Sequence, residues 1–309
     1  MTDATGFDSA AGQAEWRLDG RDVPVNRLDE ALWPENGVTK DDLLAYYRDM
    51  APTMLPYFAD RPATLFICRG GIDGHCFYRR DLPDDAPSWL RRVGYRPASR
   101  ATGPETQLPL VDDAAGLVWL ANAGAIEFHL WTAHAPALTQ PDQVVFDLDP
   151  GEGATFPQAL EAAALLHETL TDLGLRGCAK TSGGRGMHVI LPLAPGPSYV
   201  AVRAWAKGVA ARMAAARPDL IATQGGATHR GSRVTVDYAQ NSIGRNTAAP
   251  YTVRARPGAP VSTPVTWDEV RAGRIDPAAF NLRSVPARVA TVGDLFRAAL
   301  GPGQALPPL

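Results

Sequence analysis

Residues 143–151 read QVVFDLDPG, and this stretch decides how the rest of the sequence is interpreted. Its apolar residues predict a β-strand that ends at Asp149, in which side chains two apart point to the same face. Asp147 and Asp149 therefore share one face, roughly 6.6 Å apart along the strand, while Phe146 and Leu148 face a core. Two like charges on one face repel each other unless a cation lies between them. Oxygen-rich carboxylate sites favour Mg²⁺ or Mn²⁺, although a bare DxD motif is also common elsewhere.

A second acid-bearing strand is predicted over residues 233–238, RVTVDY. Its valines face one way, and Asp237 faces the other. A third carboxylate would complete a two-metal site, in which the ions clamp the attacking and leaving oxygens of a displaced phosphorus. An aspartate at a strand exit can instead belong to a turn. Acids on two apolar strands favour the metal interpretation, with Asp147, Asp149 and Asp237 as catalytic metal ligands.

Helices and strands are expected to alternate around these two strands. Residues 61–118 are expected to form short strands and loops. Helices are predicted over 39–54, from Thr155 to just before Gly174, over 198–216 and after Thr266, and strands over 178–181, 189–193 and 251–256. This order predicts an α/β (α+β) fold in which a sheet is layered with helices.

A glycine-rich segment, KTSGGRGMH at residues 180–188, lies between the two acid-bearing strands. Glycines let backbone amides approach an anion, and Ser182 can donate a further hydrogen bond. Arg185 and His188 add charge or donors suited to a triphosphate. The segment lacks the Walker pattern, and such a segment is more often only a turn. Its place between the two strands favours phosphate binding.

Three further motifs have both a structural and a functional interpretation. His129 lies in the predicted strand AIEFHLW, and a single histidine on a strand is more often a structural residue than an active-site residue. Arg254 and Arg256 would alternate on one strand face and could both reach phosphate oxygens. Residues 77–80, FYRR, are either an aromatic and basic patch that stacks on bases or an ordinary edge strand.

The composition is that of an ordinary globular protein, with 309 residues, 45% hydrophobic residues and 20% charged residues. No apolar run is long enough to span a bilayer, and the acidic N-terminus is neither a signal nor a transit peptide. Three cysteines are too few for a disulfide framework, and none forms a CxxC pair. We therefore expect a cytoplasmic protein with reduced thiols, no structural zinc and no membrane partner.

The net charge of −3 is unusual for a nucleic-acid-binding protein, but its distribution is uneven. Residues 1–60 hold twelve carboxylates and five basic side chains, whereas residues 226–256 hold five arginines and one acid. Another six arginines lie between residues 79 and 100. Local positive strips suit phosphates held in a cleft, although each arginine alone could simply be solvated surface.

These motifs together resemble the polymerase domain of bacterial ligase D, a branch of the archaeo-eukaryotic primase superfamily. The shared segments occur in family order between about residues 24 and 285: GAIEFHLW, VVFDLDPGEG, KTSGGRGMHV, VDYAQN and APYTVRARPGAPVSTPVTWDEV. The resemblance implies a primase–polymerase fold with an RRM-like catalytic sheet and a packed N-terminal lobe. We expect one catalytic domain over residues 16–300, with lobes at about 16–120 and 121–300, and flexible ends at 1–15 and 301–309.

The resemblance also implies an activity and its partners. The family adds nucleoside triphosphates (NTP or dNTP), often ribonucleotides, to a primer at DNA gaps and broken ends, as in non-homologous end joining. Two ions, Mn²⁺ or Mg²⁺ with manganese favoured, are implied as cofactors. The KxDG motif of adenylating ligases is absent, so a separate DNA ligase is expected as a partner, together with an end-binding protein.

Residue roles follow from the same resemblance. Asp147, Asp149 and Asp237 match the metal ligands, and Lys40 matches one of two lysines that grip a downstream 5′-phosphate. Contacts to the incoming nucleotide are matched by Ser182, Arg185, His188, Gln240 and Arg254, and a contact to the nucleotide or its sugar is matched by His129. The aromatic pair that stacks against the template end is matched by Phe77 and Tyr78, and a further DNA contact is matched by Arg80.

The chain also departs from the family pattern. Glu30, in LDEALWP, stands where the family usually has the second phosphate lysine, and an acid there would repel a phosphate. Ile67 stands where arginine is common. Arg80 and Arg185 replace lysines, which keeps the charge but alters the geometry.

Two other functions remain open at this level. A strand that ends in DLDPG also resembles the nucleophile motif of haloacid-dehalogenase-like phosphatases, although no acidic GDxxxD loop follows. The departures at Glu30 and Ile67 would suit a catalytically silent module that binds DNA ends.

Overall fold

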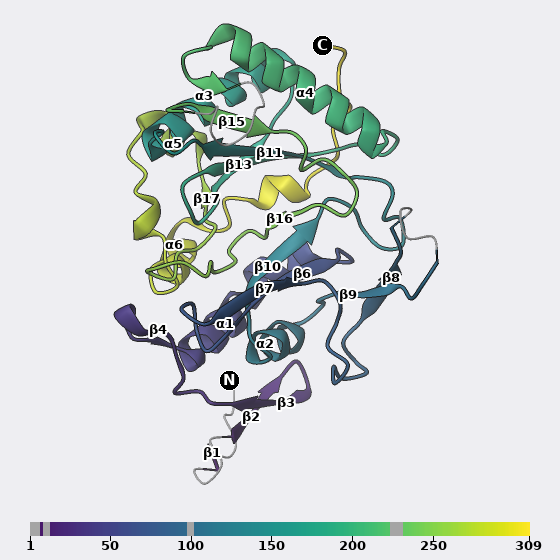
Figure 1. Ribbon diagram of the computed structural model, residues 1–309, viewed down its shortest axis with the longest axis vertical. Coiled ribbons are helices and arrows are strands. Elements are labelled where there is room, and N and C mark those ends of the chain that lie inside the picture. The colour runs from purple at the N-terminus through teal and green to yellow at the C-terminus, as the bar shows by residue number, and fades with distance from the viewer. Residues whose placement is uncertain (1–6, 9–12, 98–101, 223–230) are drawn as a thin grey trace.

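The computed structural model describes residues 7–8, 13–97, 102–222 and 231–309 of the chain. Two sheets face each other, and each is covered by helices on its outer side (Figure 1). Val145 and Ile190 of the larger sheet are buried in the same core as the smaller one. The mixed α/β architecture that the sequence predicts is confirmed.

The larger sheet carries the acidic strands. Its order is β14-β15-β11-β13-β12-β17, antiparallel throughout except for β14 and β15. In that order the strands are Ile221–Ala222, Val234–Asp237, Gln143–Pro150, Met187–Pro192, Cys178–Thr181 and Pro264–Val265. One face is covered by α3 (Phe156–Asp172), α4 (Tyr199–Ala216) and α5 (Trp267–Ala272), at the top of Figure 1. Phe146 and Leu148 are fully buried beneath these helices, as the alternation predicts.

The smaller sheet has the order β16-β10-β6-β7. These strands are Asn246–Ala248, Ala125–Trp131, Ala63–Arg69 and His75–Arg79, and α1 (Lys40–Phe58) and α2 (Ala114–Asn122) lie against them. Short sheets surround this part of the chain: β1–β3 at Phe7–Asp8, Gln13–Leu18 and Arg21–Asn26, β4 and β5 at Ala31–Trp33 and Val38–Thr39, and β8 and β9 at Arg92–Tyr95 and Thr106–Pro109. The remaining helices are α6 (Val285–Val292) and the 3₁₀ turns Pro34–Asn36, Pro277–Ala279 and Arg297–Leu300.

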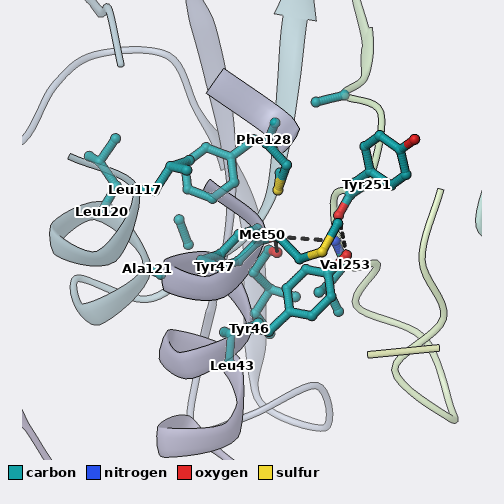
Figure 2. Close-up of a cluster of buried hydrophobic side chains, with 14 of the residues drawn as sticks. Leu43, Tyr46, Tyr47, Met50, Leu117, Leu120, Ala121, Phe128, Tyr251 and Val253 are labelled. Atoms are coloured by element: carbon teal, nitrogen blue, oxygen red, sulfur yellow. Dashed lines mark hydrogen bonds between the residues drawn. The ribbon is translucent and has the colours of Figure 1, made fainter. Parts of the chain in front are cut away.

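Helix α1 fixes a loop that later reaches the functional site. Its N-terminus is closed by a capping box between Thr39 and Asp42, an arrangement that contributes roughly 1 kcal/mol. Figure 2 shows two tyrosines of α1 between α2, β10 and the segment around Tyr251. The hydroxyl of Tyr46 donates to the carbonyl of Tyr251 at 2.7 Å, and the hydroxyl of Tyr47 accepts from the amide of Val253 at 3.2 Å. The helix therefore fixes the backbone of residues 251–253.

Several sequence-based expectations about local structure are wrong. Residues 251–256 do not form a strand, because Tyr251 has a φ of +65° and only Val253 makes an isolated bridge, to Val261. Residues 114–118 were expected to lie in short strands or loops, but they begin helix α2. Its sequence AAGLVWLAN is apolar nearly all round because most of it is buried, so it lacks an amphipathic period. Helix α6 was also not predicted.

The expectation of reduced thiols is contradicted by a disulfide between Cys68 and Cys76. The two residues lie directly opposite each other on β6 and β7. A hairpin register that could not be read from the spacing brings them together. The third cysteine, Cys178, is free.

The ends and the lobe boundary also differ from expectation. Residues 301–309 contact the larger sheet and α4: Gln304 forms a bridge with Leu193, and the indole of Trp205 donates to the carbonyl of Pro307 at 2.8 Å. The expected flexible segment 1–15 falls mostly outside the described residues, and its described parts are strands. The smaller sheet takes β10 and β16 from beyond residue 120, so the expected boundary does not separate the two sheets.

Candidate active site

The strand register brings two of the three predicted carboxylates face to face. Asp147 on β11 lies directly opposite Asp237 on β15, and Asp149 lies opposite Thr235. Directly opposed residues of antiparallel strands have Cβ atoms about 5 Å apart. Asp149 is exposed at the end of the strand, between the buried Leu148 and Pro150. One sheet face thus presents all three acids, with Asp147 and Asp237 adjacent.

Hydrogen bonds hold these carboxylates from the protein side. The Nε2 atom of His188 lies 3.4 Å from Asp147, and the amide of Ala239 donates to Asp237 at 2.8 Å. The amide group of Gln240 also donates to Asp237, at 3.4 Å. Burial raises the pKa of Asp147, but the neighbouring His188 and the positive side chains nearby outweigh it and hold the pKa below its usual value.

A buried lysine continues the chain of contacts behind His188. Lys180 is fully buried, and its Nζ donates to Nδ1 of His188 at 2.7 Å and to Oγ of Ser262 at 2.6 Å. Because the ionised carboxylate of Asp147 can only accept, Nε2 of His188 carries the proton that faces it, and Nδ1 accepts from Lys180. Burial, with the charge of Lys180, lowers the pKa of His188 to about 4, so the ring is neutral at pH 7.

A cavity of about 390 Å³ opens beside Asp147 between the two sheets. Seven predicted site residues line it, with five that the sequence did not single out. Its lining comprises Thr64, Tyr78, Arg80, His129, Asp147, His188, Gln240, Arg245, Asn246, Thr247, Ala248 and Arg254.

Arg254 spans the two sheets at this cavity. Its Nε donates to the buried carboxylate of Glu127 on β10 at 2.8 Å, and its NH1 donates to the carbonyl of Ser182. Gly183 has a φ of +70°, and a Cβ there would lie 2.5 Å from Cγ of Arg254, so only glycine leaves room for this side chain. The loop fixed by α1 delivers Arg254 to this position.

In the glycine-rich loop, the side chains that were predicted to bind phosphate form hydrogen bonds with the protein backbone. The Oγ atom of Ser182 accepts from the amides of Gly184 and Gly186, both at 3.2 Å. Arg185 turns away from the cavity and donates to the carbonyls of Gly151 and Ala154 at 2.9 and 2.8 Å. Neither Ser182 nor Arg185 lines the cavity.

The predicted template pair is split between the two faces of β7. Tyr78 is 59% exposed and packs edge-on against His129, with ring centroids 5.3 Å apart. Phe77 alternates to the opposite face and packs against the core of α1 and α2. Only Tyr78 and Arg80 reach the cavity.

Lys40 lies in a separate cavity of about 150 Å³, together with Arg27, Glu30 and Arg69. Lys40 is only 3% exposed, and its Nζ donates to Asn26 at 3.0 Å. Burial and the positive Arg27 lower the pKa of Lys40 to about 8, against the opposing effect of Glu30. The carboxylate of Glu30 is 3.6 Å from Nε of Arg27.

The carboxylate oxygens of Asp147, Asp149 and Asp237 are suitable ligands for a hard cation. Among the described residues, no group of three or more His, Cys, Asp or Glu side chains is gathered closely enough to form a ready metal site. Two opposed carboxylates with a third on the same sheet face nevertheless supply the oxygen donors that Mg²⁺ and Mn²⁺ prefer. The metal assignment therefore remains a prediction.

Sequence reasoning missed several residues that build the cavity. Asn246 donates to Thr64 at 3.0 Å; Thr64 lies opposite His129 on β6, and Asn246 lies opposite Trp131 on β16. Glu127 and Lys180 lie beneath the predicted contacts. The burial of these charged side chains depends on how the strands pair, which the sequence pattern does not show. The only indication in the sequence was that Glu127 precedes His129 by two residues and so shares its strand face.

Glu127 should make the free energy of unfolding depend on pH. Burial raises its pKa, but the hydrogen bond from His129 and the charge of Arg254 outweigh burial and lower the pKa from an ordinary 4.5 to about 2. Its contribution of about 3 kcal/mol is then fully present above about pH 4.5 and is lost as the pH falls towards 2, because the unfolded chain takes up the proton first. Urea unfolding of the wild type and of Glu127→Gln between pH 6 and pH 3 should show a shrinking difference. A difference that stays constant, while the exposed control Glu168→Gln follows the wild type, would contradict this.

Comparison with known proteins identifies the class to which this fold and site belong. The family model described as "LigD, primase-polymerase domain" matches residues 39–296. The chain therefore belongs to the LigD primase–polymerase family, as its motifs predict.

No helix of the described residues is both long and apolar enough to cross a bilayer.

Relatives of known name are similar in sequence over most of this chain. The "Multifunctional non-homologous end joining DNA repair protein LigD" of Mycobacterium tuberculosis is 36% identical over 286 residues, which are 89% of this chain and 36% of that protein. The Pseudomonas aeruginosa LigD is 34% identical over 86% of this chain and 31% of its own length. The chain thus spans about a third of these relatives. A solved structure, "Polymerase Domain from Mycobacterium tuberculosis Ligase D in complex with DNA", superposes with a TM-score of 0.83 at 33% identity, covering 91% of this chain and 98% of the other.

Proposed function

We propose that this chain is a metal-dependent, template-directed nucleotidyltransferase that extends primers and fills gaps at DNA breaks, as in non-homologous end joining. The observation that carries the proposal is the direct opposition of Asp147 and Asp237 beside a cavity that also holds Arg254. Membership of the LigD primase–polymerase family supports it. That family assignment also leaves the phosphatase alternative without support.

The side chains have distinct tasks in this proposal. Asp147, Asp149 and Asp237 would hold two ions, Mn²⁺ or Mg²⁺, which when bound lower the pKa of a primer 3′-hydroxyl and neutralise the triphosphate. His188 donates through Nε2 to Asp147 and keeps that carboxylate in one orientation. Arg254, held at two of its nitrogens, meets phosphate oxygens of the incoming nucleotide with its remaining donors.

A groove next to the cavity suits a nucleic-acid strand. It has a volume of about 790 Å³ and shares Arg80 and Arg245 with the nucleotide cavity. Tyr95, the exposed Ile243 and two acids, Asp81 and Glu105, also line it. Basic side chains that follow the backbone, together with aromatic faces for the bases, are the usual means of binding single strands. We assign this groove to DNA, in keeping with the DNA complex of the structural relative.

Primer extension tests the proposed function. The wild-type chain with Mn²⁺ and a gapped duplex should add nucleotides in the order that the template dictates, with NTP and dNTP compared in parallel. Addition that ignores the template, or hydrolysis of a simple phosphate ester without polymerisation, would overturn the proposal. A separate ligase should be needed to seal the product, and an end-binding protein is the expected further partner.

The 5′-phosphate at the far side of a gap should matter little to this chain. Glu30 faces the cavity that holds Lys40, and its negative charge opposes a phosphate there. Extension should differ by less than about twofold with and without the phosphate. Glu30→Lys should introduce a preference for the phosphorylated gap of about fivefold, from one added favourable charge contact. The control Glu168→Lys, at an exposed position of α3, should introduce none. A strong preference in the wild type would show that Lys40 and its neighbours suffice without a second lysine.

A further inference from the structure

Strand β15 leaves the larger sheet at Asp237, and a buried asparagine side chain continues its pairing with β11. The last pair of that ladder is Asp147 with Asp237. Two residues earlier on β11, Asn241 binds both backbone groups of Val145. The amide of Val145 donates to Oδ1 at 2.8 Å, and Nδ2 donates to the carbonyl of Val145 at 2.7 Å. Asn241 is only 1% exposed, so these bonds are shielded from water.

The same side chain closes the turn that carries two residues of the site. Nδ2 of Asn241 also donates to the carbonyl of Tyr238 at 3.1 Å, and its backbone amide donates to that carbonyl at 3.1 Å. Within the turn, Asp237 accepts from the amide of Ala239 at 2.8 Å and from the side chain of Gln240 at 3.4 Å. Gln240 lines the nucleotide cavity. One buried carboxamide therefore ties the whole turn to β11.

The segment that follows β15 needs such an anchor because it crosses from one sheet to the other. Residues 238–245 belong to no strand, and β16 then pairs with β10 in the smaller sheet. A carboxamide carries an N–H donor and an oxygen acceptor side by side, so it can replace a peptide group of the missing strand. The bonds from Asn241 to Val145 thus hold the crossing segment on the larger sheet.

We propose that Asn241 is a positioning residue that keeps Asp237 opposite Asp147 and Gln240 at the cavity, so that the carboxylates meet a divalent cation in a fixed arrangement. This rests on the proposed function, because it takes Asp147 and Asp237 as metal ligands. Asn241 is not part of the cavity lining. It acts on the cation only through the turn that it anchors.

This role predicts a specific kind of defect. Without the anchor, the turn should sample arrangements in which Asp237 is displaced, and only a fraction of the molecules would be ready to bind metal. The apparent metal affinity then falls by that fraction, but an excess of metal restores the competent arrangement. Residues that hold metal ligands in place typically contribute 10- to 100-fold to metal affinity or activity. The loss should therefore appear in the metal requirement and not in the rate at saturating metal.

A second carboxamide in the chain offers a matched control. Gln304 accepts from the amide of Arg176 at 2.8 Å and donates to the carbonyl of the same residue at 2.8 Å. It lies in the C-terminal segment that bridges to Leu193, and it does not line the nucleotide cavity. Gln304→Ala therefore removes the same pair of bonds without touching the turn after β15.

The metal dependence of primer extension tests the proposal. The wild type, Asn241→Ala and Gln304→Ala are compared over a range of Mn²⁺ concentrations, at a temperature at which circular dichroism shows all three folded. Asn241→Ala should need about tenfold more Mn²⁺ for half of its maximal rate, while its rate at saturating Mn²⁺ should stay within about threefold of the wild type. Gln304→Ala should match the wild type. A rate that is lowered equally at every Mn²⁺ concentration would indicate general damage and overturn the proposal.

Amide hydrogen exchange tests the anchor without metal or nucleotide. In Asn241→Ala, the amides of Val145 and Ala239 should exchange at least about tenfold faster than in the wild type, because local opening of the turn becomes easier. In Gln304→Ala, exchange should be faster at Arg176 and unchanged at Val145 and Ala239. If Ala239 stays as protected in Asn241→Ala as in the wild type, the anchor does not reach Asp237. That result would overturn the proposal whether or not the chain is a polymerase.

The outcomes distinguish the positioning role from the proposed function. If the wild type extends primers and Asn241→Ala shares its Mn²⁺ requirement, the positioning role is wrong while the function stands. If Asn241→Ala does not fold, Asn241→Ser, which keeps a hydroxyl for one backbone group of Val145, takes its place. It should raise the Mn²⁺ requirement at least about threefold, and an unchanged requirement would overturn the proposal. If the wild type extends no primer at any Mn²⁺ concentration, the proposed function fails, and the exchange of Ala239 alone decides whether Asn241 orders Asp237.

Discussion

Replacing Asp149 by alanine should lower primer extension by at least about a hundredfold, because under the proposed function Asp149 is a direct metal ligand, and its removal should cost more than the loss of an outer-shell partner. Asp149 is exposed at the end of β11, between Leu148 and Pro150, which are both buried. The substitution removes the carboxylate without disturbing the core, so the folding stability should change little.

Two measurements on Asp149→Ala are needed to attribute the lost primer extension to weaker metal binding. Extension of a gapped duplex gives the activity, and calorimetric titration with Mn²⁺ in the presence of nucleotide gives the metal affinity. Both should fall together, whereas Asp172→Ala, at an exposed position of α3, should behave as the wild type. Undiminished extension would remove Asp149 from the metal site. A wild type that binds DNA but shows no metal-dependent nucleotide binding would instead favour the silent end-binding module.

Replacing Arg254 by alanine should weaken nucleotide binding about ten- to a hundredfold, since charge-assisted hydrogen bonds to phosphate are lost. It should also lower the free energy of unfolding by about 3–5 kcal/mol, because the buried carboxylate of Glu127 loses its charged partner. Calorimetry and urea unfolding measure the two effects. The neighbouring Arg256 is exposed, so Arg256→Ala should leave stability nearly unchanged.

A double variant separates these two roles of Arg254. Combining Arg254→Ala with Glu127→Gln removes the uncompensated charge, so part of the lost stability should return while the nucleotide affinity stays low. Equal losses of stability in the single and double variants would mean that packing, not charge, accounts for the effect of Arg254→Ala.

Local patterns predicted much of the larger sheet. Alternation placed β11 and β15, buried Phe146 and Leu148, and put Asp147, Asp149 and Asp237 on the opposite face. Thr155 and Ser198 begin α3 and α4 as predicted. These features depend on neighbours in sequence, which a pattern can express.

The missing parts depend on pairing across the fold. The opposition of Asp147 and Asp237 is a matter of strand register, which the sequence pattern did not set. Arg185 had donors suited to phosphate, yet nearby carbonyls of the loop after β11 occupy its guanidinium. The role of Glu127 appears only when segments 127 residues apart meet. Tertiary contact, and not local propensity, decides each of these.

The return of β16 to the smaller sheet has a consequence for how such a protein can be divided. Strand β16 pairs with β10, while β15, a few residues earlier, belongs to the other sheet. A chain cut between β10 and β11 would keep the larger sheet whole but would leave the first part without β16, and without Tyr251 and Val253 of its core. The first part should therefore not fold alone, so exchange between relatives should keep the region from β6 to β16 together.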